Sequence, residues 1–193
     1  MLASRDRFLL ADEMGLGKTW QAAIAAPDDP RLLVVCPAAV KGVWHAELRR
    51  LRPELFVPVL SGRGSFRWPM MGSAVILNYD LLPDAPGAPP AGVTVIADEA
   101  HAVKAPSATR TKRFRAISRA ALNAGGRAWL LTGTPLLNRP AELWSICGAA
   151  DLAEDAFDDW PTFKRLFQCA ADKVYVRGGH GETREVIRWG EPL

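Results

Sequence analysis

Residues 8–19 of this chain read F-L-L-A-D-E-M-G-L-G-K-T, and they decide the fold. The apolar run at the start predicts a buried strand, and the residues from Lys18 onward predict a helix. The same alternation continues along the sequence, which predicts an α/β fold: a parallel sheet with helices on both sides. The expected strands are Phe8–Ala11, Leu32–Cys36, Leu55–Leu60, Ala74–Asn78, Val93–Ala97 and Ala128–Leu131. The expected helices are Lys18–Ala26, Val40–Leu51, Ser107–Leu122 and Pro140–Ala149.

The loop inside this stretch ends in Gly17-Lys18-Thr19, as a phosphate-binding loop does. The common motif G-x-x-x-x-G-K-[ST] has a glycine five places before Gly17, but Asp12 occupies that place. Backbone N–H groups around Gly15 and Gly17 can surround phosphate oxygens at the positive end of a helix. Lys18 would then reach the β- and γ-phosphates, and the Thr19 hydroxyl would ligate Mg²⁺. The alternative is a glycine turn that begins an ordinary helix.

The charges are unevenly distributed along the chain. With 193 residues, of which 49% are hydrophobic and 23% charged, the composition is that of one globular domain with a substantial core. Between Ala102 and Ala141 eight residues are Lys or Arg and none is Asp or Glu, so the rest of the chain carries −5, eight below the total of +3. A near-neutral protein needs such a separation of positive from negative charge if one of its faces is to bind nucleic acid.

Cysteine use and the lack of long apolar runs indicate the expected compartment. Cys36, Cys147 and Cys169 are widely spaced and match no metal-ligand pattern, which favours a reducing environment. No apolar run approaches the ~18 residues of a membrane span. The first residues, M-L-A-S-R-D-R-F, carry charges where a signal peptide needs its apolar stretch. We therefore expect a cytoplasmic protein without a membrane partner.

A second motif, V-T-V-I-A-D-E-A-H at 93–101, places Asp98 and Glu99 at the carboxyl end of an expected strand. Phosphoryl transfer to water needs one carboxylate to hold Mg²⁺ and another group to position the attacking water. Asp98 suits the first role, and Glu99 suits the second, also as a general base. Two neighbouring acids after a strand are otherwise a solvated strand end. The phosphate loop upstream, in an alternating α/β chain, favours the catalytic interpretation.

A third motif, A-W-L-L-T-G-T-P at 128–135, also follows an expected strand. Thr132 and Thr134 carry small hydroxyl groups on either side of Gly133, and these can link the γ-phosphate region to another surface. A strand-to-helix turn stopped by Pro135 is the alternative for this stretch alone. All three motifs follow strands, and open parallel sheets bind ligands at the carboxyl ends of their strands.

Together and in this order, D-E-M-G-L-G-K-T, D-E-A-H and L-T-G-T-P-L-L-N-R-P-A-E-L-W resemble the motifs of the SWI/SNF family of superfamily-two DNA-dependent ATPases. In that family an Asp stands in place of the first loop glycine, which accounts for Asp12. Further stretches are similar to motif Ia (L-L-V-V-C-P-A-A-V-K-G-V-W-H-A-E-L), motif Ib (I-L-N-Y-D-L-L) and the helix after motif III (F-D-D-W-P-T-F-K-R-L-F). The resemblance covers roughly residues 8–170.

The resemblance implies a RecA-like, three-layer α/β/α P-loop fold with a mostly parallel central sheet. It also implies an ATP hydrolase that uses ATP and Mg²⁺, in which Lys18, Asp98 and Glu99 are catalytic. Thr19 and Asp98 would hold the metal. The nucleotide-binding residues carried over from the family are Asp12, Glu13, Met14, Gly15, Leu16, Gly17, Lys18 and Thr19.

The family also implies translocation along double-stranded DNA, generally without separation of the strands. The residues that would couple nucleotide state to DNA contact are His101, Thr132, Gly133 and Thr134. The likeness is closest to bacterial, phage and fork-remodelling members. We therefore expect a bacterial or phage-type, nucleoid-associated cytoplasmic protein.

Four basic residues are candidates for contact with the DNA backbone. On a helix, Lys112, Arg115 and Arg119 share one stripe, whereas Phe114 and Ile117 share another. Phosphate binding by the first stripe competes with a simpler interpretation, a solvated helix face. The fourth candidate is Lys41, which follows the Cys-Pro turn of motif Ia and is better placed for a backbone contact.

We expect two parts, residues 1–150 as the first RecA-like lobe and residues 151–193 as a helical extension with a flexible tail. Family members also carry an upstream glutamine motif and a second RecA-like lobe with an arginine finger, and neither is matched here. Because such a finger contributes about 10³–10⁵ in rate, the chain alone should bind ATP weakly and hydrolyse it slowly. The alternatives are a non-catalytic DNA- or protein-binding module and an RNA helicase of the D-E-A-H type, which the first and third motifs match poorly.

Overall fold

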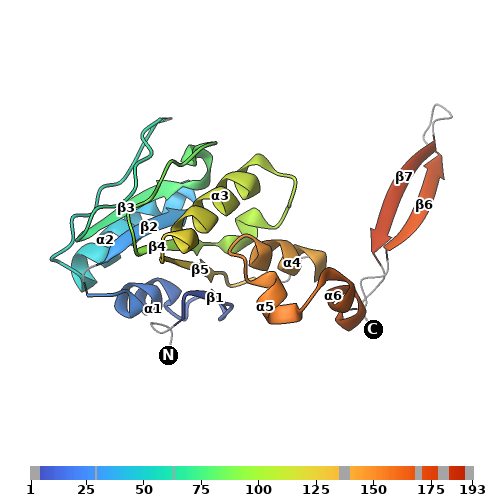
Figure 1. The fold of residues 1–193 in the computed structure, drawn as a ribbon, viewed down its shortest axis with the longest axis horizontal. Helices are drawn as coiled ribbons and strands as arrows, with labels where there is room; N and C mark the ends of the chain where they lie inside the picture. The colour runs from blue at the N-terminus through green and yellow to red at the C-terminus, as the bar shows by residue number, and fades with distance from the viewer. Residues whose placement is uncertain are drawn as a thin grey trace.

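A five-stranded sheet lies at the centre of the protein (Figure 1). The computed structural model describes residues 5–28, 30–62, 64–134, 140–167, 171–177 and 183–189. Neighbouring strands pair in the order β1-β5-β4-β2-β3, and every pair is parallel, as the sequence predicts. The strands are β1 (Arg7–Leu10), β2 (Arg31–Cys36), β3 (Ser73–Asn78), β4 (Val93–Asp98) and β5 (Arg127–Leu131).

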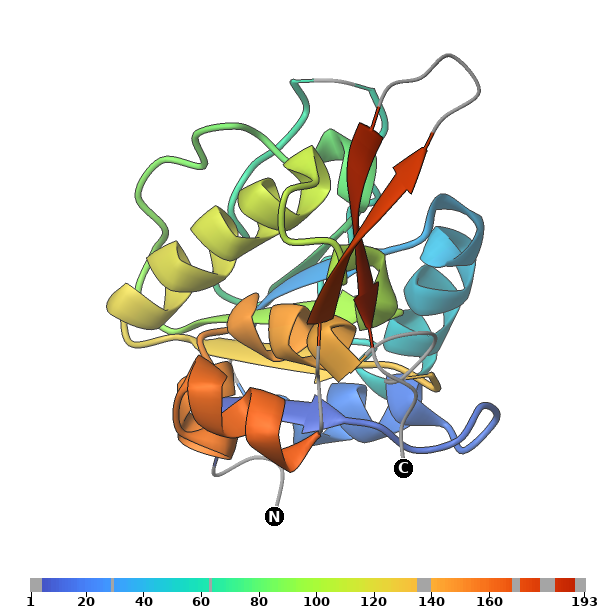
Figure 2. The same ribbon diagram turned by 90° about the vertical axis from the view of Figure 1, so that its right-hand side faces the viewer.

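Helices cover both faces of this sheet, with α2 and α3 on opposite sides (Figure 2). Buried residues of α1 and α2 join Leu32 and Val34 on one face. Residues of α3 and α4 join Leu33 and Val35 on the other. Successive strand residues point to opposite faces, so a continuous apolar run is buried on both sides. The predicted three-layer α/β/α fold is therefore confirmed. The helices are α1 (Lys18–Ala25), α2 (Lys41–Leu51), α3 (Thr109–Asn123) and α4 (Pro140–Gly148).

Shorter helices follow the strands and extend the chain beyond α4. The residues packed between α4 and the two short helices after it include Leu143, Cys147 and Phe163. α6 begins after Asp159, whose side chain accepts a hydrogen bond of 2.8 Å from the Thr162 N–H. No described helix is long and apolar enough to cross a membrane. These elements are η1 (Ala38–Val40), η2 (Tyr79–Leu81), η3 (Ala100–Val103), α5 (Ala153–Phe157) and α6 (Trp160–Leu166).

The segment at 55–60, expected to be a strand, forms only two isolated parallel bridges to β3. Phe56 accepts from the Ala74 N–H and Pro58 accepts from the Ile76 N–H, which is the spacing of a parallel ladder. The bond from residue 58 to the Ala74 carbonyl is missing, because proline has no N–H. One proline therefore prevents the sixth strand that the apolar pattern predicts.

The end of the chain forms an antiparallel hairpin of β6 (Ala171–Arg177) and β7 (Thr183–Trp189). The sequence analysis predicts a flexible tail for this part of the chain; residues 178–182, between the two strands, lie outside the described residues. The flanks read A-D-K-V-Y-V-R and T-R-E-V-I-R-W, whose β-branched and aromatic residues are typical of strands. The division into parts at residue 150 stays a prediction.

Candidate functional site

Three loops leave the carboxyl ends of three neighbouring strands. β5 lies between β1 and β4, and Leu131 pairs with Leu10 on one side and with Asp98 on the other. The Thr132 N–H also donates a hydrogen bond of 3.0 Å to the Leu10 carbonyl. The chain after β5 therefore starts level with the chain after β1. The three motifs that were predicted to act together meet at one edge of the sheet.

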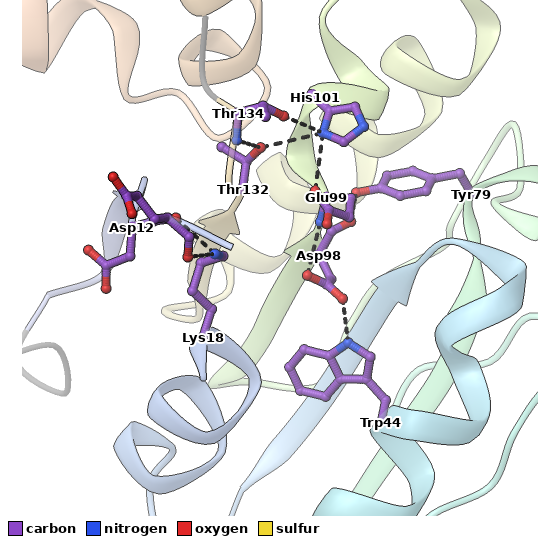
Figure 3. A network of polar contacts seen from close by, with 10 residues as sticks. Asp12, Lys18, Trp44, Tyr79, Asp98, Glu99, His101, Thr132 and Thr134 are labelled. Atoms are coloured by element: carbon purple, nitrogen blue, oxygen red, sulfur yellow. Dashed lines mark hydrogen bonds and ion pairs between the residues drawn. The ribbon is translucent and has the colours of Figure 1, made fainter. Parts of the chain in front are cut away.

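The loop after β1 is folded around the ammonium group of Lys18 (Figure 3). Lys18 Nζ donates to the backbone carbonyls of Asp12 and Glu13, each at 2.8 Å. Gly15 and Gly17 have φ values of 85° and 69°, a left-handed backbone that glycine adopts readily. Gly17 also precedes α1 and supplies no side-chain cap to its first N–H groups. A lysine beside an uncapped helix N-terminus favours the binding of an anion.

Asp12, which stands in place of the first loop glycine, is tied to helix α1. Gln21 Nε2 donates to Asp12 Oδ2 at 3.2 Å and to the Leu16 carbonyl at 3.0 Å. One amide group therefore bridges the two ends of the loop, through a carboxylate that glycine lacks. No sequence motif singles out Gln21, because its role depends on one turn of α1 facing back toward the loop.

Gly133 lies directly against this loop. A Cβ atom on residue 133 would lie 2.7 Å from Met14 Cγ, 3.4 Å from Met14 N and 3.5 Å from Lys18 Nζ. The first distance is shorter than a van der Waals contact, so a side chain here would displace Met14. The predicted coupling residue Gly133 is thus next to the predicted phosphate loop.

Asp98, at the end of β4, is held by three donors (Figure 3). The Trp44 indole donates to Asp98 Oδ2 at 2.7 Å, and the Glu99 N–H donates to Oδ1 at 3.0 Å. The Tyr79 hydroxyl donates to the Asp98 carbonyl at 2.8 Å. Both carboxylate oxygens and the main chain are therefore fixed, while each carboxylate oxygen keeps capacity for a further partner.

Glu99 follows in a left-handed backbone conformation, with φ 51° and ψ 54°. This conformation costs a non-glycine residue about 1–3 kcal/mol and is concentrated at functional sites. Its carboxylate Oε2 lies 3.2 Å from Nδ1 of His101. The same nitrogen lies 3.4 Å from the hydroxyls of both Thr132 and Thr134. The backbone turn thus directs Glu99 toward the third motif, and His101 connects the two.

Burial changes the acidity of two groups close to Asp98. It raises the pKa of the Tyr79 hydroxyl well above its ordinary value of 10.0, and the negative charge of Asp98 adds to the shift. Burial likewise raises the pKa of the Cys36 thiol to about 12, with a further contribution from Asp98. Both groups therefore remain protonated at neutral pH, and Tyr79 stays a hydrogen-bond donor.

The predicted DNA-contacting residues lie in different surroundings. Lys41 Nζ donates to the Leu60 carbonyl at 3.0 Å. On α3, Arg119 pairs with Asp151 at 3.0 Å, Arg115 is half-buried, and Lys112 is exposed. Only Lys112 of this stripe is an exposed cation without an ion-pair partner among the described residues. Contact of these four residues with DNA stays a prediction.

Acidic residues from elsewhere balance much of the basic segment at 102–141. Four of its eight cations form ion pairs with carboxylates outside the segment, at distances from 2.7 to 3.9 Å. The local field is therefore weaker than the uneven distribution along the sequence predicts. Arg139 lies outside the described residues. The pairs are Lys104–Glu142, Arg113–Asp84, Arg119–Asp151 and Arg127–Asp6.

Two aromatic residues of the site were not predicted to act there. In the sequence, Trp44 stands out only as part of the stretch similar to motif Ia. Tyr79 was noticed only as part of motif Ib. Both have a buried ring and one polar atom, and buried tryptophan and tyrosine donors usually find an acceptor. That tendency gives a reason to look for a partner, but it does not identify Asp98.

Comparisons with known proteins point in one direction. A family model described as the SNF2-related domain matches residues 3–187. The chain is 40% identical over 183 residues to the DNA annealing helicase and endonuclease ZRANB3 of Mus musculus. The aligned region covers 88% of this chain and 16% of that protein. It is 37% identical over 152 residues to the SWI/SNF-related matrix-associated actin-dependent regulator of chromatin subfamily A-like protein 1 homolog of Caenorhabditis elegans, covering 72% of this chain and 21% of that protein.

A solved structure supports the same relationship. The SWI2/SNF2 ATPase core of Sulfolobus solfataricus in complex with dsDNA has a TM-score of 0.62 and 27% sequence identity, over 82% of this chain and 34% of that chain. This chain therefore spans about a third of that structure. It spans 21% or less of the length of the two curated relatives described above.

These matches correct the expected setting of the protein. The sequence was predicted to be cytoplasmic and of bacterial or phage type, and that prediction is wrong. The relatives include animal proteins and Protein CHROMATIN REMODELING 19 of Arabidopsis thaliana, at 35% identity over 173 residues. The motifs were a poor guide because phosphate and metal chemistry restricts them in the same way in every compartment.

Proposed function

This chain belongs to the SNF2-related domain family, and we propose that it is the ATP-binding lobe of a DNA-dependent ATPase that moves on duplex DNA. The observation that carries the proposal is that Lys18 lies after β1, and Asp98 and Glu99 lie at the end of β4, on the two sides of β5 at the same carboxyl edge of the sheet. A cationic group facing acidic groups suits a nucleoside triphosphate with its magnesium ion, since the cation can bind phosphate and a carboxylate can bind the metal.

In this proposal the loop after β1 binds the phosphates. The uncapped N-terminus of α1 offers backbone N–H groups, and Lys18 supplies the charge. The Lys18 ammonium is now bound by the carbonyls of Asp12 and Glu13. It would exchange these two acceptors for oxygens of the β- and γ-phosphates, so the loop changes shape when ATP binds.

Asp98 and the Thr19 hydroxyl would hold Mg²⁺, because both offer the oxygen ligands that this ion prefers. Magnesium, when bound, neutralises charge that develops on the phosphates. The described residues contain no group of three His, Cys, Asp or Glu side chains that could form a protein cage. This suits an ion that keeps waters and takes ligands from its nucleotide.

Glu99 would orient the attacking water and accept its proton. Its carboxylate is paired with His101, which also lies 3.4 Å from the hydroxyls of Thr132 and Thr134. A change in the third motif would therefore reach the water-orienting residue through one imidazole ring. We propose that this connection couples the state of the nucleotide to contact with DNA.

Two partners complete the proposal. Double-stranded DNA is one, because the related archaeal core was solved in complex with dsDNA and residues 102–141 are basic. Lys41 and Lys112 are the first backbone contacts to test. The second partner is another RecA-like lobe, which would provide an arginine finger for the γ-phosphate.

The proposal is tested by Lys18→Ala, with Lys164→Ala as the matched control. Lys164 is an exposed lysine of α6, on a different part of the surface. Binding of a fluorescent ATP analogue with Mg²⁺ should fall at least about 100-fold in Lys18→Ala, because a charge-assisted contact to two phosphates is lost. Lys164→Ala should bind as the wild type does. Equal binding by all three proteins would refute the nucleotide site.

A non-catalytic DNA- or protein-binding module is the second candidate function. One observation favours it: the Lys18 ammonium is already occupied by two carbonyls of its own loop. Mixing the chain with a candidate second lobe and duplex DNA separates the two functions. Mg²⁺-dependent ATP hydrolysis that Lys18→Ala abolishes supports the enzyme. DNA binding without any measurable binding of ATP supports the module.

A further inference from the structure

We propose that Trp44 is a positioning residue for Asp98, which makes helix α2 part of the metal-binding side of the site. The inference rests on the proposed role of Asp98 as a magnesium ligand. Trp44 lies on α2, and its indole N–H donates to Asp98 Oδ2 at 2.7 Å (Figure 3). Trp44 therefore links the core between α2 and the sheet to the Asp98 carboxylate at the end of β4.

The ring of Trp44 is immobilised by its surroundings. It is 0% exposed and belongs to the apolar cluster that packs α1 and α2 on the sheet. An indole nitrogen is only a donor, and a buried donor left without an acceptor is costly. The ring and its N–H direction are thus fixed by packing, and the carboxylate of Asp98 is the acceptor that satisfies it.

The other two donors to Asp98 cannot replace this bond. The Glu99 N–H belongs to the next residue along the chain, so it does not tie the carboxylate to another element of the fold. The Tyr79 hydroxyl holds the Asp98 carbonyl and not the side chain. Among the described residues, the bond from Trp44 alone ties the carboxylate to another element of the fold. It therefore determines the direction in which Asp98 presents its free lone pairs.

The effect of Trp44 extends to the second acidic residue. Asp98 Oδ1 accepts the Glu99 N–H at 3.0 Å, and Glu99 has the left-handed backbone that turns its carboxylate toward His101. A carboxylate that rotates away would release that N–H. Trp44 is accordingly expected to orient Asp98 directly and Glu99 through it.

The chain contains a matched control for this residue. Trp129 is also 0% exposed, lies in the same apolar cluster, and also uses its indole N–H. Its acceptor is the backbone carbonyl of Arg5, at 3.2 Å, and not a carboxylate. Trp44→Phe and Trp129→Phe therefore remove the same atoms from similarly buried positions, but only the first touches the proposed metal ligand.

The first experiment measures the binding of a fluorescent ATP analogue as Mg²⁺ is added. Removing a hydrogen bond that orients a ligand typically weakens metal binding by about 10- to 100-fold. We expect Trp44→Phe to raise the Mg²⁺ concentration at half-effect by that factor and to leave binding in EDTA unchanged. Trp129→Phe should match the wild type in both. An identical Mg²⁺ dependence in Trp44→Phe and Trp129→Phe overturns the inference.

The second experiment observes the indole N–H signals by NMR. It compares the wild type with Asp98→Ala, so Trp44 is intact in both proteins. Assignment of the wild-type spectrum through the backbone identifies the two signals. In Asp98→Ala the Trp44 signal should shift and its proton should exchange faster with water, since the acceptor is gone, while the Trp129 signal should stay in place. A Trp44 signal that does not respond to Asp98→Ala overturns the inference, even if Trp44→Phe itself folds poorly.

Asp98→Ala also separates this inference from the proposed function. If it leaves the Mg²⁺ dependence of nucleotide binding unchanged, Asp98 is not a magnesium ligand and the proposed function fails. If Asp98→Ala removes that dependence while Trp44→Phe does not alter it, the proposed function stands and only the positioning role of Trp44 fails.

Discussion

The two sides of the candidate site are built in different ways. On the loop side, Lys18 is held by backbone carbonyls of Asp12 and Glu13 in a largely exposed loop. On the strand side, Asp98 is held by Trp44 and Tyr79, two aromatic residues of the core. Loop carbonyls can be replaced by phosphate oxygens without a loss of packing, but buried rings cannot move without one. We infer that ATP rearranges the loop, whereas the acidic side is already in place.

The largest expected effect comes from Glu99→Gln, which tests the acidic side. Glutamine keeps the shape of Glu99 but cannot accept the proton of water, and loss of a general base typically costs about 10²–10⁴ in rate. We expect single-turnover ATP hydrolysis, measured with a candidate second lobe and duplex DNA, to fall by at least about 100-fold. Binding of Mg²⁺ and ATP should be retained, which is the opposite of the result expected for Lys18→Ala. Hydrolysis at the wild-type rate would remove Glu99 from the proposed mechanism.

Gly133→Ala tests how freely the loop side can move, and a smaller effect is expected. The new Cβ would lie 2.7 Å from Met14 Cγ, so the Met14 side chain must shift. We expect nucleotide affinity to fall about 10-fold, the result of roughly 1.4 kcal/mol of overpacking strain. Fluorescence titration measures the change.

The double variant Met14→Ala/Gly133→Ala provides the control for that experiment. Removing the Met14 side chain opens the space that the new methyl group needs, so most of the lost affinity should return. If the double variant binds ATP no better than Gly133→Ala, the clash with Met14 is not the cause. The loop would then be more rigid than the contrast between the two sides implies.

Tyr79→Phe should have the smallest effect, on stability. It removes the hydrogen bond to the Asp98 carbonyl, which is worth about 1 kcal/mol of unfolding free energy. The pKa of Tyr79 is raised in the folded protein, so the wild type gains stability from this group below about pH 10 and loses it as the pH rises further. The phenylalanine variant has no such titration.

Urea unfolding at about pH 8 and about pH 10.5 checks this prediction. The stability difference between the wild type and Tyr79→Phe should be larger at the lower pH and should shrink at the higher one. A difference that stays constant would mean that Tyr79 titrates normally. In that case the acidic side is more open to water than its burial indicates.

The fold was largely predictable because its strands are buried on both faces. Val93–Ala97 was predicted from a continuous apolar run, and the structure places β4 at Val93–Asp98. The segment at 55–60 has a similar run but lacks one ladder hydrogen bond, since residue 58 is proline. The apolar pattern of a segment predicts that it is buried. Whether the buried segment becomes a strand depends on whether its residues have the backbone N–H groups that the ladder requires.

The site was predictable to the extent that its parts are local in sequence. Lys18 and Thr19 share one loop-to-helix turn, and Asp98 and Glu99 share one strand end. Trp44 and Asp98 are 54 residues apart and meet only because β2 and β4 are neighbours and α2 packs across them. A single sequence does not determine which side chain of a helix faces which strand end, so this contact required the structure.

The parallel register has a consequence for insertions and deletions. Leu131 is aligned with Leu10 and with Asp98, so an extra residue within β5 would reverse the facing of Trp129 and Leu130 and misalign Thr132 with both neighbours. Extra residues at 83–92, which enter β4 from its amino end, would leave that alignment intact. Insertions and deletions among natural variants of this domain should therefore be concentrated in the loops at the amino ends of the strands, opposite the candidate site.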